Sequence, residues 1–211
     1  MTPSEFIPFE TSVDYKPLLN RNKGPNTGGM GCISPSPFMN DVLREKIIKK
    51  VVQPTIDGLN KMGVSYYGFM YFGLMVKDDN PQVLEFNCRL GDPETQCLMM
   101  QMDSDLVECL EDALNNKKVS ISWKQGSSMG VVIASSGYPE KYKTKLPIKI
   151  GNLDKLKLFH AGTEIVEKEL LTSGGRVFSL NYHASNLEDC MSYIYNRICL
   201  LYTSPSPRDM S

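Results

Sequence analysis

Three polar side chains alternate with apolar ones in the segment VLEFNCRLGDPETQ, residues 83–96. Glu85, Asn87 and Arg89 occupy every second position, and a strand sends such side chains to one face. Glu85 and Asn87 would then lie about 7 Å apart along that face. Mg²⁺ is typically held by one or two oxygen ligands of the protein together with substrate phosphates. Arg89 adds a guanidinium fork suited to a phosphate or carboxylate. The segment therefore predicts a metal and phosphate site on a strand.

The alternative interpretation is an edge strand whose polar face meets only solvent. Three features favour the functional interpretation. The face combines a carboxylate, an amide and a guanidinium, the segment runs into the turn Gly91-Asp92-Pro93, and a glycine-rich loop lies upstream. Pro93 is also suited to the first position of a helix.

The upstream loop reads GPNTGGMG, residues 24–31, with four glycines in eight residues. Glycines let backbone N–H groups turn toward an anion without obstruction by a Cβ. The spacing matches neither a P-loop nor a dinucleotide-binding fingerprint. Anion binding and a plain turn therefore both stay open for this loop.

Composition limits the classes of protein to consider. The 211 residues are 41% hydrophobic and 22% charged, with a formal net charge of −1. This fits a soluble globular protein and argues against nucleic-acid or membrane partners bound through bulk positive charge. No apolar run is long enough to span a bilayer, and no signal peptide is visible. The six cysteines form no close pair, which argues against zinc and favours a reducing, cytoplasmic setting.

The pattern of apolar residues predicts an α+β protein. In the first half we expect a helix capped at Asn40, interrupted by Pro54 and ended by Gly63. A buried strand over residues 66–76 and a hairpin loop over 77–81 should follow, and then helices over 95–102 and after a capping box at Asp105.

The second half predicts a smaller α+β unit. Strands are expected over residues 131–134, 156–160, 164–166 and 176–182. A capping box at Ser185 and Glu188 predicts a final helix. The Ser/Pro-rich tail after residue 202 is expected to be disordered.

The motifs GPNTGGMG (24–31) and EFNCRLGDPETQ (85–96), in this order, resemble the phosphoribosylamine–glycine ligase family of the ATP-grasp superfamily. GVVIASSGYP (130–139), FHAGT (159–163) and GGRV (174–177) resemble its C-terminal domain. The resemblance covers roughly residues 9–198. It implies the C-terminal lobe of an ATP-grasp domain, with antiparallel sheet and helices, over 1–116, and the family's C-terminal domain over 117–199. Residues 200–211 would be a non-native tail.

The resemblance also implies roles for individual residues. Glu85 and Asn87 match the ligands of Mg²⁺ or Mn²⁺. Arg89 matches a residue near the nucleotide phosphates, and Arg89 and Asp92 are the implied catalytic residues. The remaining matches hold substrate or its phosphate: Asn26, Thr27, Gly28, Gly29, Met30, Arg89, Asp92 and Glu94.

The implied reaction is an ATP-dependent ligation of purine biosynthesis in the cytoplasm. ATP phosphorylates the carboxylate of glycine, and the amine of phosphoribosylamine displaces the phosphate. Glycinamide ribonucleotide, ADP and phosphate result. The partners are these small molecules, with no nucleic acid and no membrane, and membership of a larger multifunctional purine enzyme stays open.

The family protein is longer than this chain, and its N-terminal domain and ATP lid would precede Met1. The sequence therefore predicts a fragment that is inactive when isolated. The alternative is a non-catalytic remnant that keeps metal and phosphate binding only. Another ATP-grasp ligase, such as a carboxylase subunit, is disfavoured because the two motifs together point to one family.

Overall fold

The computed structural model describes residues 1–2 and 5–198, so the predicted disordered tail lies outside the described residues. The chain forms two compact units, and each is described by itself. Unit 1 comprises residues 1–11, 36–91 and 102–123, and unit 2 comprises residues 12–35, 92–101 and the chain from 124 onward. The division predicted at residues 116 and 199 concerns family domains and stays a prediction.

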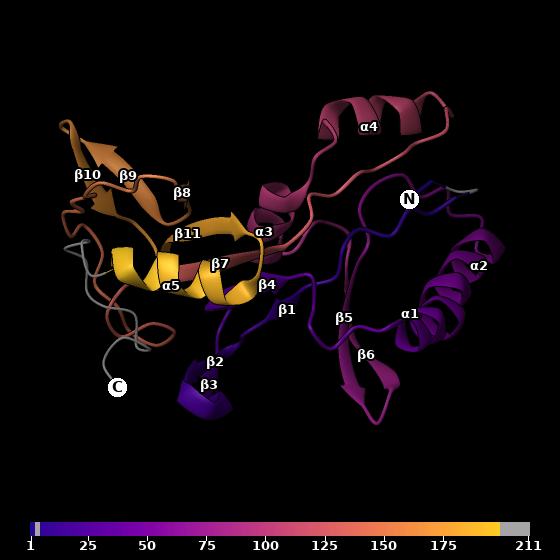
Figure 1. The fold of residues 1–211 in the computed structure, drawn as a ribbon, viewed down its shortest axis with the longest axis horizontal. Helices are drawn as coiled ribbons and strands as arrows, with labels where there is room; N and C mark the ends of the chain where they lie inside the picture. Colours follow the sequence, from indigo (N-terminus) through magenta and orange to yellow (C-terminus); the bar gives the residue numbers. More distant parts are fainter. Residues whose placement is uncertain (3–4, 199–211) are drawn as a thin grey trace. The chain divides into compact units, whose positions relative to one another are not determined.

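Unit 1 combines helices with one β-ribbon (Figure 1). Its elements are α1 (Asp41–Ile47), the π-helical η2 (Ile48–Val52), α2 (Gln53–Lys61), β5 (Tyr71–Lys77), β6 (Asn80–Asn87) and α4 (Leu106–Leu114). Among the described residues, no helix is long and apolar enough to cross a membrane.

The helix boundaries in unit 1 follow the predicted signals. The Asn40 side chain accepts a hydrogen bond from the Leu43 N–H at 2.8 Å, which satisfies a free donor of the first turn. Pro54 lies at the start of α2, directly after the π-helical segment, so the predicted interruption is confirmed. Gly63 follows the last turn with a φ of +71°. Asp105 caps α4 through its carboxylate.

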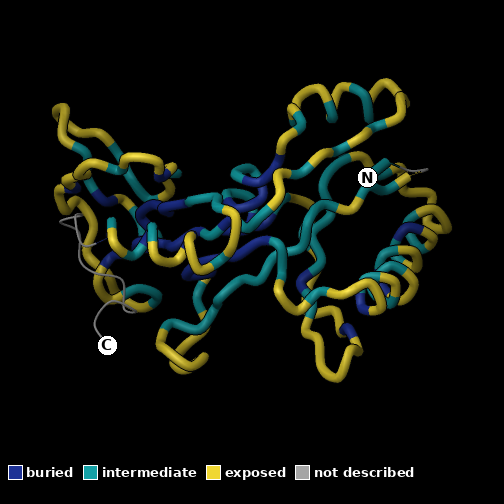
Figure 2. The backbone as a smooth tube through the Cα atoms, viewed as in Figure 1, coloured by how far each residue is buried: buried dark blue, intermediate teal, exposed yellow. Residues whose placement is uncertain are grey.

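The β5–β6 ribbon corrects one prediction. A buried strand over 66–76 was expected, but the strand begins at Tyr71 and much of the ribbon is exposed (Figure 2). Met75 is 56% exposed and Phe86 is 52% exposed. Among the described strands, β5 and β6 pair only with each other, so no sheet neighbour covers their apolar side chains. The apolar run was correctly assigned as a strand, but burial depends on neighbours that a local pattern does not specify.

Unit 2 is built on a five-stranded antiparallel sheet in the order β1-β4-β7-β11-β8. These strands are β1 (Val13–Asp14), β4 (Gly31–Ser34), β7 (Ser127–Ala134), β11 (Arg176–Ala184) and β8 (Lys157–His160). Two ribbons accompany the sheet: β2 (Pro17–Leu19) with β3 (Lys23–Asn26), joined by the 3₁₀ turn η1 (Asn20–Asn22), and β9 (Thr163–Val166) with β10 (Glu169–Thr172). The strands β2, β3, β4 and β10 were not predicted.

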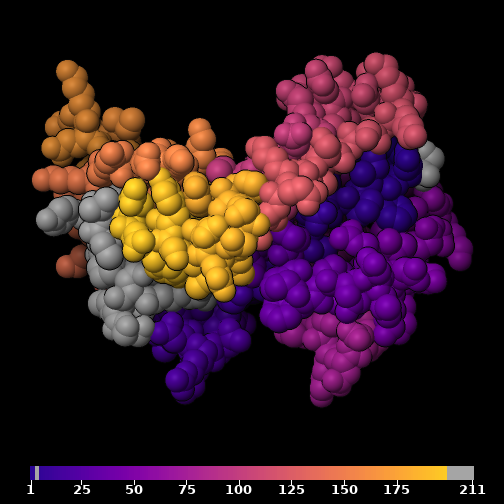
Figure 3. All heavy atoms as spheres, viewed as in Figure 1, coloured from indigo at the N-terminus to yellow at the C-terminus, as the bar shows by residue number. Residues whose placement is uncertain are grey.

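Two helices pack on this sheet, α3 (Glu94–Gln101) and α5 (Leu187–Ile198). Val131 and Leu180 are register partners on neighbouring strands and share a buried cluster with Ile194 of α5. The opposite face carries Gly130 and Asn181, which meet the Cys97 side chain of α3. Alternation along β7 therefore produces one apolar face beneath α5 and one small, polar face beneath α3. Figure 3 shows α5 in yellow on the near side of unit 2.

The start of α5 differs by one residue from the predicted capping box. The Asn186 side chain, rather than Ser185, accepts the hydrogen bond from the Asp189 N–H, at 2.9 Å. Ser185 instead donates to the Asp189 carboxylate at 3.1 Å. Adjacent Ser and Asn residues both favour capping positions, so the sequence alone could not decide between them.

Two isoleucines in unit 2 allow a matched test of the core. Ile194 is fully buried and Ile165 is 76% exposed. We expect Ile194→Ala to lower the free energy of unfolding by about 2–5 kcal/mol, because it leaves a cavity beneath α5. Ile165→Ala should change it by no more than about 0.5 kcal/mol. Urea unfolding followed by circular dichroism measures both, and equal effects would contradict the assignment of the core.

Candidate functional site

The two predicted metal ligands lie side by side on β6. Glu85 is the register partner of Gly73, and Asn87 is the register partner of Tyr71. The β-bulge of this ribbon falls before Glu85, so both residues belong to its regular part and face the same way. A Cβ placed on Gly73 would lie 2.8 Å from Glu85 Cγ and 3.4 Å from its Oε1. The missing side chain of Gly73 therefore gives the Glu85 side chain room to lie across β5.

Arg89 lies outside the strand, which ends at Asn87. The prediction that Arg89 continues the strand is therefore wrong. Its guanidinium nevertheless turns back, because Nη2 donates to Asn87 Oδ1 at 3.4 Å and Nη1 donates to the Leu90 carbonyl at 2.9 Å. A carbonyl oxygen has two lone pairs, so Asn87 Oδ1 keeps one acceptor site beside this cation.

The donor atoms on β6 suit a hard cation. Glu85 is exposed and supplies a carboxylate, while Asn87 supplies an amide oxygen. Over residues 1–2 and 5–198, no three or more His, Cys, Asp or Glu side chains form a group that could hold a metal ion. An ion held by Glu85 and Asn87 would therefore take its other ligands from water or from a bound phosphate.

The glycine-rich loop lies in unit 2, between β3 and β4. The four backbone N–H groups of Thr27–Met30 all bond within the unit. Their acceptors, in order, are Lys16 O, Tyr138 Oη, Thr27 Oγ1 and Tyr15 O, at 2.9, 2.9, 3.0 and 2.9 Å. None of these donors is directed at an incoming anion in this conformation. The sequence left anion binding and a plain turn open for this loop, and in this conformation the glycines let the loop fold onto its own unit.

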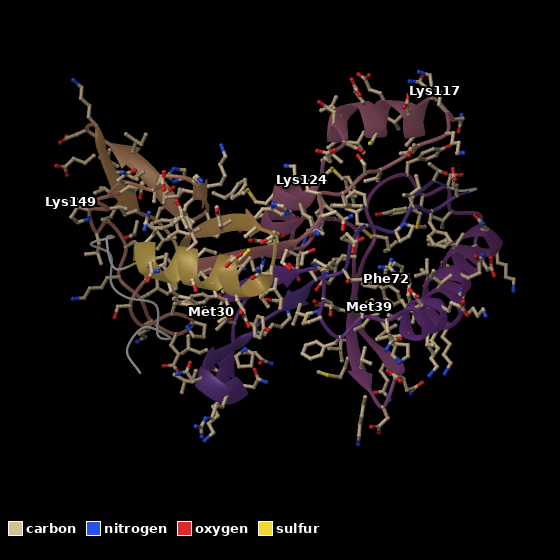
Figure 4. The ribbon with its side chains drawn as sticks, viewed as in Figure 1. Met30, Met39, Phe72, Lys117, Lys124 and Lys149 are labelled. Carbon is tan, nitrogen blue, oxygen red and sulfur yellow. The ribbon has the colours of Figure 1, made fainter. Side chains whose placement is uncertain are left out.

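The predicted substrate residues of this loop differ in exposure. Asn26 and Gly28 are exposed, whereas Gly29 and Met30 are buried. Met30, labelled in Figure 4, is 1% exposed and belongs to the core. The Thr27 hydroxyl donates to the Lys16 carbonyl at 2.7 Å and so helps to close the loop. Of the predicted substrate residues in this loop, only Asn26 and Gly28 are exposed in this conformation.

The Asp-Pro turn before α3 packs against the same loop. A Cβ on Gly29 would lie 2.5 Å from Pro93 Cδ, so only a glycine permits this approach. The Asp92 carboxylate is half exposed and accepts from Gln96 Nε2 at 3.0 Å. Glu94 is 4% exposed at the first turn of α3. The structure thus brings together the loop, Asp92 and Glu94, as the resemblance implied.

Arg176 is a residue of this region that the sequence analysis missed. Its Nη1 donates to the Gly28 carbonyl at 2.6 Å and to the Asp92 carbonyl at 2.9 Å. Its Nη2 donates to Asp92 Oδ2 at 2.8 Å. The motif GGRV contains this arginine, but Gly28 lies 148 positions earlier in the sequence, so local patterns could not predict the contact.

Asp14 is a second residue that the sequence analysis did not single out. Its side chain is 6% exposed, and its Oδ2 lies 3.1 Å from Lys16 Nζ, so the two form an ion pair. Among the described residues, Asp14 Oδ1 has no hydrogen-bond partner. Burial, and next the charge of Glu94, raise the pKa of Asp14 to about 6, while Lys16 and Arg176 act in the opposite direction.

The predicted site residues therefore fall into two groups. Glu85, Asn87 and Arg89 lie together in unit 1, and the glycine-rich loop lies with Asp92 and Glu94 in unit 2. Each group is locally organised by contacts of its own unit.

Two family models match the chain. The ATP-grasp (A) domain of phosphoribosylglycinamide synthetase matches residues 2–95, and the C domain of the same protein matches residues 128–203. The first match includes Glu85, Asn87 and the glycine-rich loop, and the second includes Tyr138 and Arg176.

Proteins named phosphoribosylamine–glycine ligase are similar to the chain. The protein of Allochromatium vinosum is 40% identical over 200 residues, which cover 91% of this chain and 46% of the relative. That of Salmonella typhimurium is 46% identical over 179 residues, which cover 81% of this chain and 42% of the relative. The chain thus spans less than half the length of these curated relatives.

Solved structures agree with these matches. The crystal structure of phosphoribosylamine–glycine ligase from Thermotoga maritima superposes with a TM-score of 0.87 at 30% identity, covering 96% of this chain and 51% of that one. The biotin carboxylase domain of Hydrogenobacter thermophilus 2-oxoglutarate carboxylase superposes with a TM-score of 0.59 at 15% identity, covering 89% of this chain and 41% of that one. This likeness shows the fold alone. The predicted fold class, a lobe of an ATP-grasp fold with an α+β C-terminal domain, is thereby confirmed. The chain belongs to the phosphoribosylglycinamide synthetase family, whose ATP-grasp and C domains it matches in part.

Proposed function

We propose that this chain supplies the metal- and phosphate-binding part of a phosphoribosylamine–glycine ligase. The observation that carries the proposal is the Glu85–Asn87 pair on one face of β6, within the segment that the ATP-grasp family model matches. The relatives' printed name supplies the reaction, which joins glycine to phosphoribosylamine. The cofactors would be ATP and Mg²⁺ or Mn²⁺, the ions that such oxygen donors suit.

On β6, Glu85 is proposed as the dominant metal ligand because it carries a full charge, and Asn87 as the weaker, neutral ligand. A divalent ion bound there would neutralise charge on the transferred phosphate. Arg89, whose guanidinium already reaches Asn87, is proposed to contact a phosphate oxygen beside that ion. These groups act by positioning and by neutralising charge, so the reaction requires no protein nucleophile.

In unit 2, Asn26 and Gly28 are proposed to contact the substrate, because they are the exposed members of the predicted set. Asp92 is also exposed and lies beside Gly28, since both accept hydrogen bonds from Arg176. Glu94 and the buried loop residues are proposed to support this surface from below. An exposed amide, carbonyl and carboxylate suit a substrate that carries amine and hydroxyl groups.

A chimera tests the ligase assignment. Residues 1–198 of this chain would replace the matching segment of the Salmonella typhimurium relative, which supplies the rest of that protein. We expect the purified chimera to form glycinamide ribonucleotide from glycine, phosphoribosylamine and MgATP. A folded chimera that forms no product, beside an active unmodified relative, would contradict the proposal and favour a non-catalytic remnant.

Glu85→Gln in the active chimera tests the metal site. The amide keeps the shape of the side chain but removes the charge that would oppose the cation. We expect kcat to fall by about 100- to 1000-fold, as for the loss of one preorganised electrostatic contact. In the chain itself, the same change should weaken binding of Mn²⁺ in the presence of ATP, as measured by electron paramagnetic resonance.

Two further variants set the scale of that result. Asn87→Ala should reduce kcat less than Glu85→Gln, because it removes a dipole rather than a charge. Glu45→Gln is the matched control, since Glu45 is an exposed glutamate of unit 1 that pairs with a neighbouring surface lysine, Lys49. Unchanged activity and Mn²⁺ binding in Glu85→Gln would refute the assignment of the β6 face.

Asp14→Asn tests the buried carboxyl group. The folded state raises the Asp14 pKa from 3.8 to about 6, so the folded protein binds more protons than the unfolded chain between these values. The Asp14 contribution to stability is therefore present below about pH 4 and is lost as the pH rises through 6. We expect Asp14→Asn to gain stability relative to the original chain between about pH 4 and pH 7. Thermal unfolding at several pH values measures this gain.

Asp154→Asn is the control for that experiment. The Tyr193 hydroxyl donates to the Asp154 carboxylate and holds its pKa below the ordinary value of 3.8. Its contribution to stability is present above that value and is lost only as the pH falls below it. The difference between this variant and the original chain should therefore stay constant from about pH 5 to pH 7. A constant difference for Asp14→Asn as well would contradict the raised pKa.

A further inference from the structure

Both polar backbone groups of Gly28 are held by side chains from the segment that the C-domain model matches. The Gly28 N–H donates to the Tyr138 hydroxyl at 2.9 Å, and its carbonyl accepts from Arg176 Nη1 at 2.6 Å. Tyr138 and Arg176 lie 110 and 148 residues away in sequence. Gly28 is exposed, so its conformation is set by these two contacts rather than by burial.

The same guanidinium holds the Asp-Pro turn. Arg176 donates to the backbone carbonyl of Asp92 at 2.9 Å and to its carboxylate at 2.8 Å. One side chain therefore connects an exposed glycine of the loop with an exposed carboxylate of the turn. A Cβ on Gly28 would lie 3.0 Å from Arg176 Cζ, so the absence of a side chain at residue 28 permits the contact.

The geometry requires an arginine. The planar guanidinium places donors on Nη1 and Nη2 so that three acceptors on two segments are reached at once. A lysine ammonium is a single point charge on a flexible stem and would not hold the three acceptors in one plane. The Arg176 side chain is 22% exposed, so its hydrogen bonds are partly shielded from water.

We propose that Arg176 and Tyr138 are positioning residues for the substrate surface formed by Gly28 and Asp92. They hold the loop and the turn in one arrangement before substrate arrives, which removes the ordering cost from binding. This inference rests on the proposed function for its substrate, the phosphoribosylamine that the loop and turn would contact. It assigns the C-terminal segment a direct part in shaping the site.

The consequence for kinetics is specific. We call the contacts of Arg176 and Tyr138 with Gly28 and Asp92 the clamp. Its loss leaves the metal-binding face of unit 1 unchanged, so the KM for ATP should not change. The KM for phosphoribosylamine should rise, because each binding event must then order the loop and turn. The loss of a hydrogen bond to a charged group corresponds to about 10- to 100-fold in an equilibrium constant.

The first measurement uses the full chain of 211 residues and needs no activity. Hydrogen exchange is followed at the amides of residues 27–31 in Arg176→Gln, Arg176→Lys and Tyr138→Phe. We expect exchange to become at least about 10-fold faster in Arg176→Gln, with Arg176→Lys intermediate. Arg197→Gln is the matched control, since Arg197 also forms an ion pair in unit 2, with Asp154. Equal exchange in Arg176→Gln and Arg197→Gln would overturn the proposal.

The second measurement uses the active chimera. We expect Arg176→Gln to raise the KM for phosphoribosylamine by about 10- to 100-fold, with an unchanged KM for ATP and a kcat within about threefold. Tyr138→Phe should act in the same direction and less strongly. A lower kcat, a higher KM for both substrates and a lower thermal stability, all together, would show a purely structural role and overturn the proposal. An inactive chimera without these substitutions would instead contradict the proposed function, and the exchange measurement would still decide whether the clamp exists.

Discussion

Unit 2 depends on the close approach of α3 to the sheet at Gly130. A Cβ there would clash with Asn181 Oδ1 of β11 and lie 3.2 Å from Cys97 Sγ of α3, so a larger residue would require both neighbours to shift. The buried polar groups at this contact are satisfied, because Ser128 donates to the Cys97 carbonyl and Asn181 donates to Ser179. The position of α3 in turn fixes the Asp-Pro turn at its N-terminus. A packing constraint in the interior thus sets the geometry of an exposed surface.

Local signals of the sequence predicted most of the elements. Asn40 and Asp105 cap the helices they were expected to cap, because capping needs only a side-chain oxygen and the next few N–H groups. The exposure of Phe86 and the short strands β4 and β10 were not predicted. Burial of a strand depends on which elements lie beside it, and four residues carry too little periodicity to separate a strand from a loop.

The candidate site was predictable where it depends on alternation along one strand. Glu85 and Asn87 share a face because the β-bulge falls before them, and a bulge between them would have separated them. The glycine-rich loop was located correctly, but its N–H groups find acceptors on Lys16, Tyr15 and Tyr138. Such contacts depend on the register of β1 with β4 and on a turn more than a hundred residues away. The role of Arg176 was not predicted for the same reason, since its partners are set by tertiary structure.

Asp14 places a buried carboxyl group next to the glycine-rich loop. A buried carboxylate oxygen without a hydrogen-bond partner is unfavourable, and the raised pKa of this group, to about 6, is the electrostatic form of that cost. An apolar residue or an asparagine at position 14 would avoid the cost, so stability alone does not account for the aspartate. Sequences depart from local rules mainly where function requires a strained or charged group. Asp14 lies against Gly29, in the loop whose Gly28 carbonyl Arg176 holds. A buried carboxyl group that is unfavourable when charged thus lies beside the surface to which the family resemblance assigns substrate.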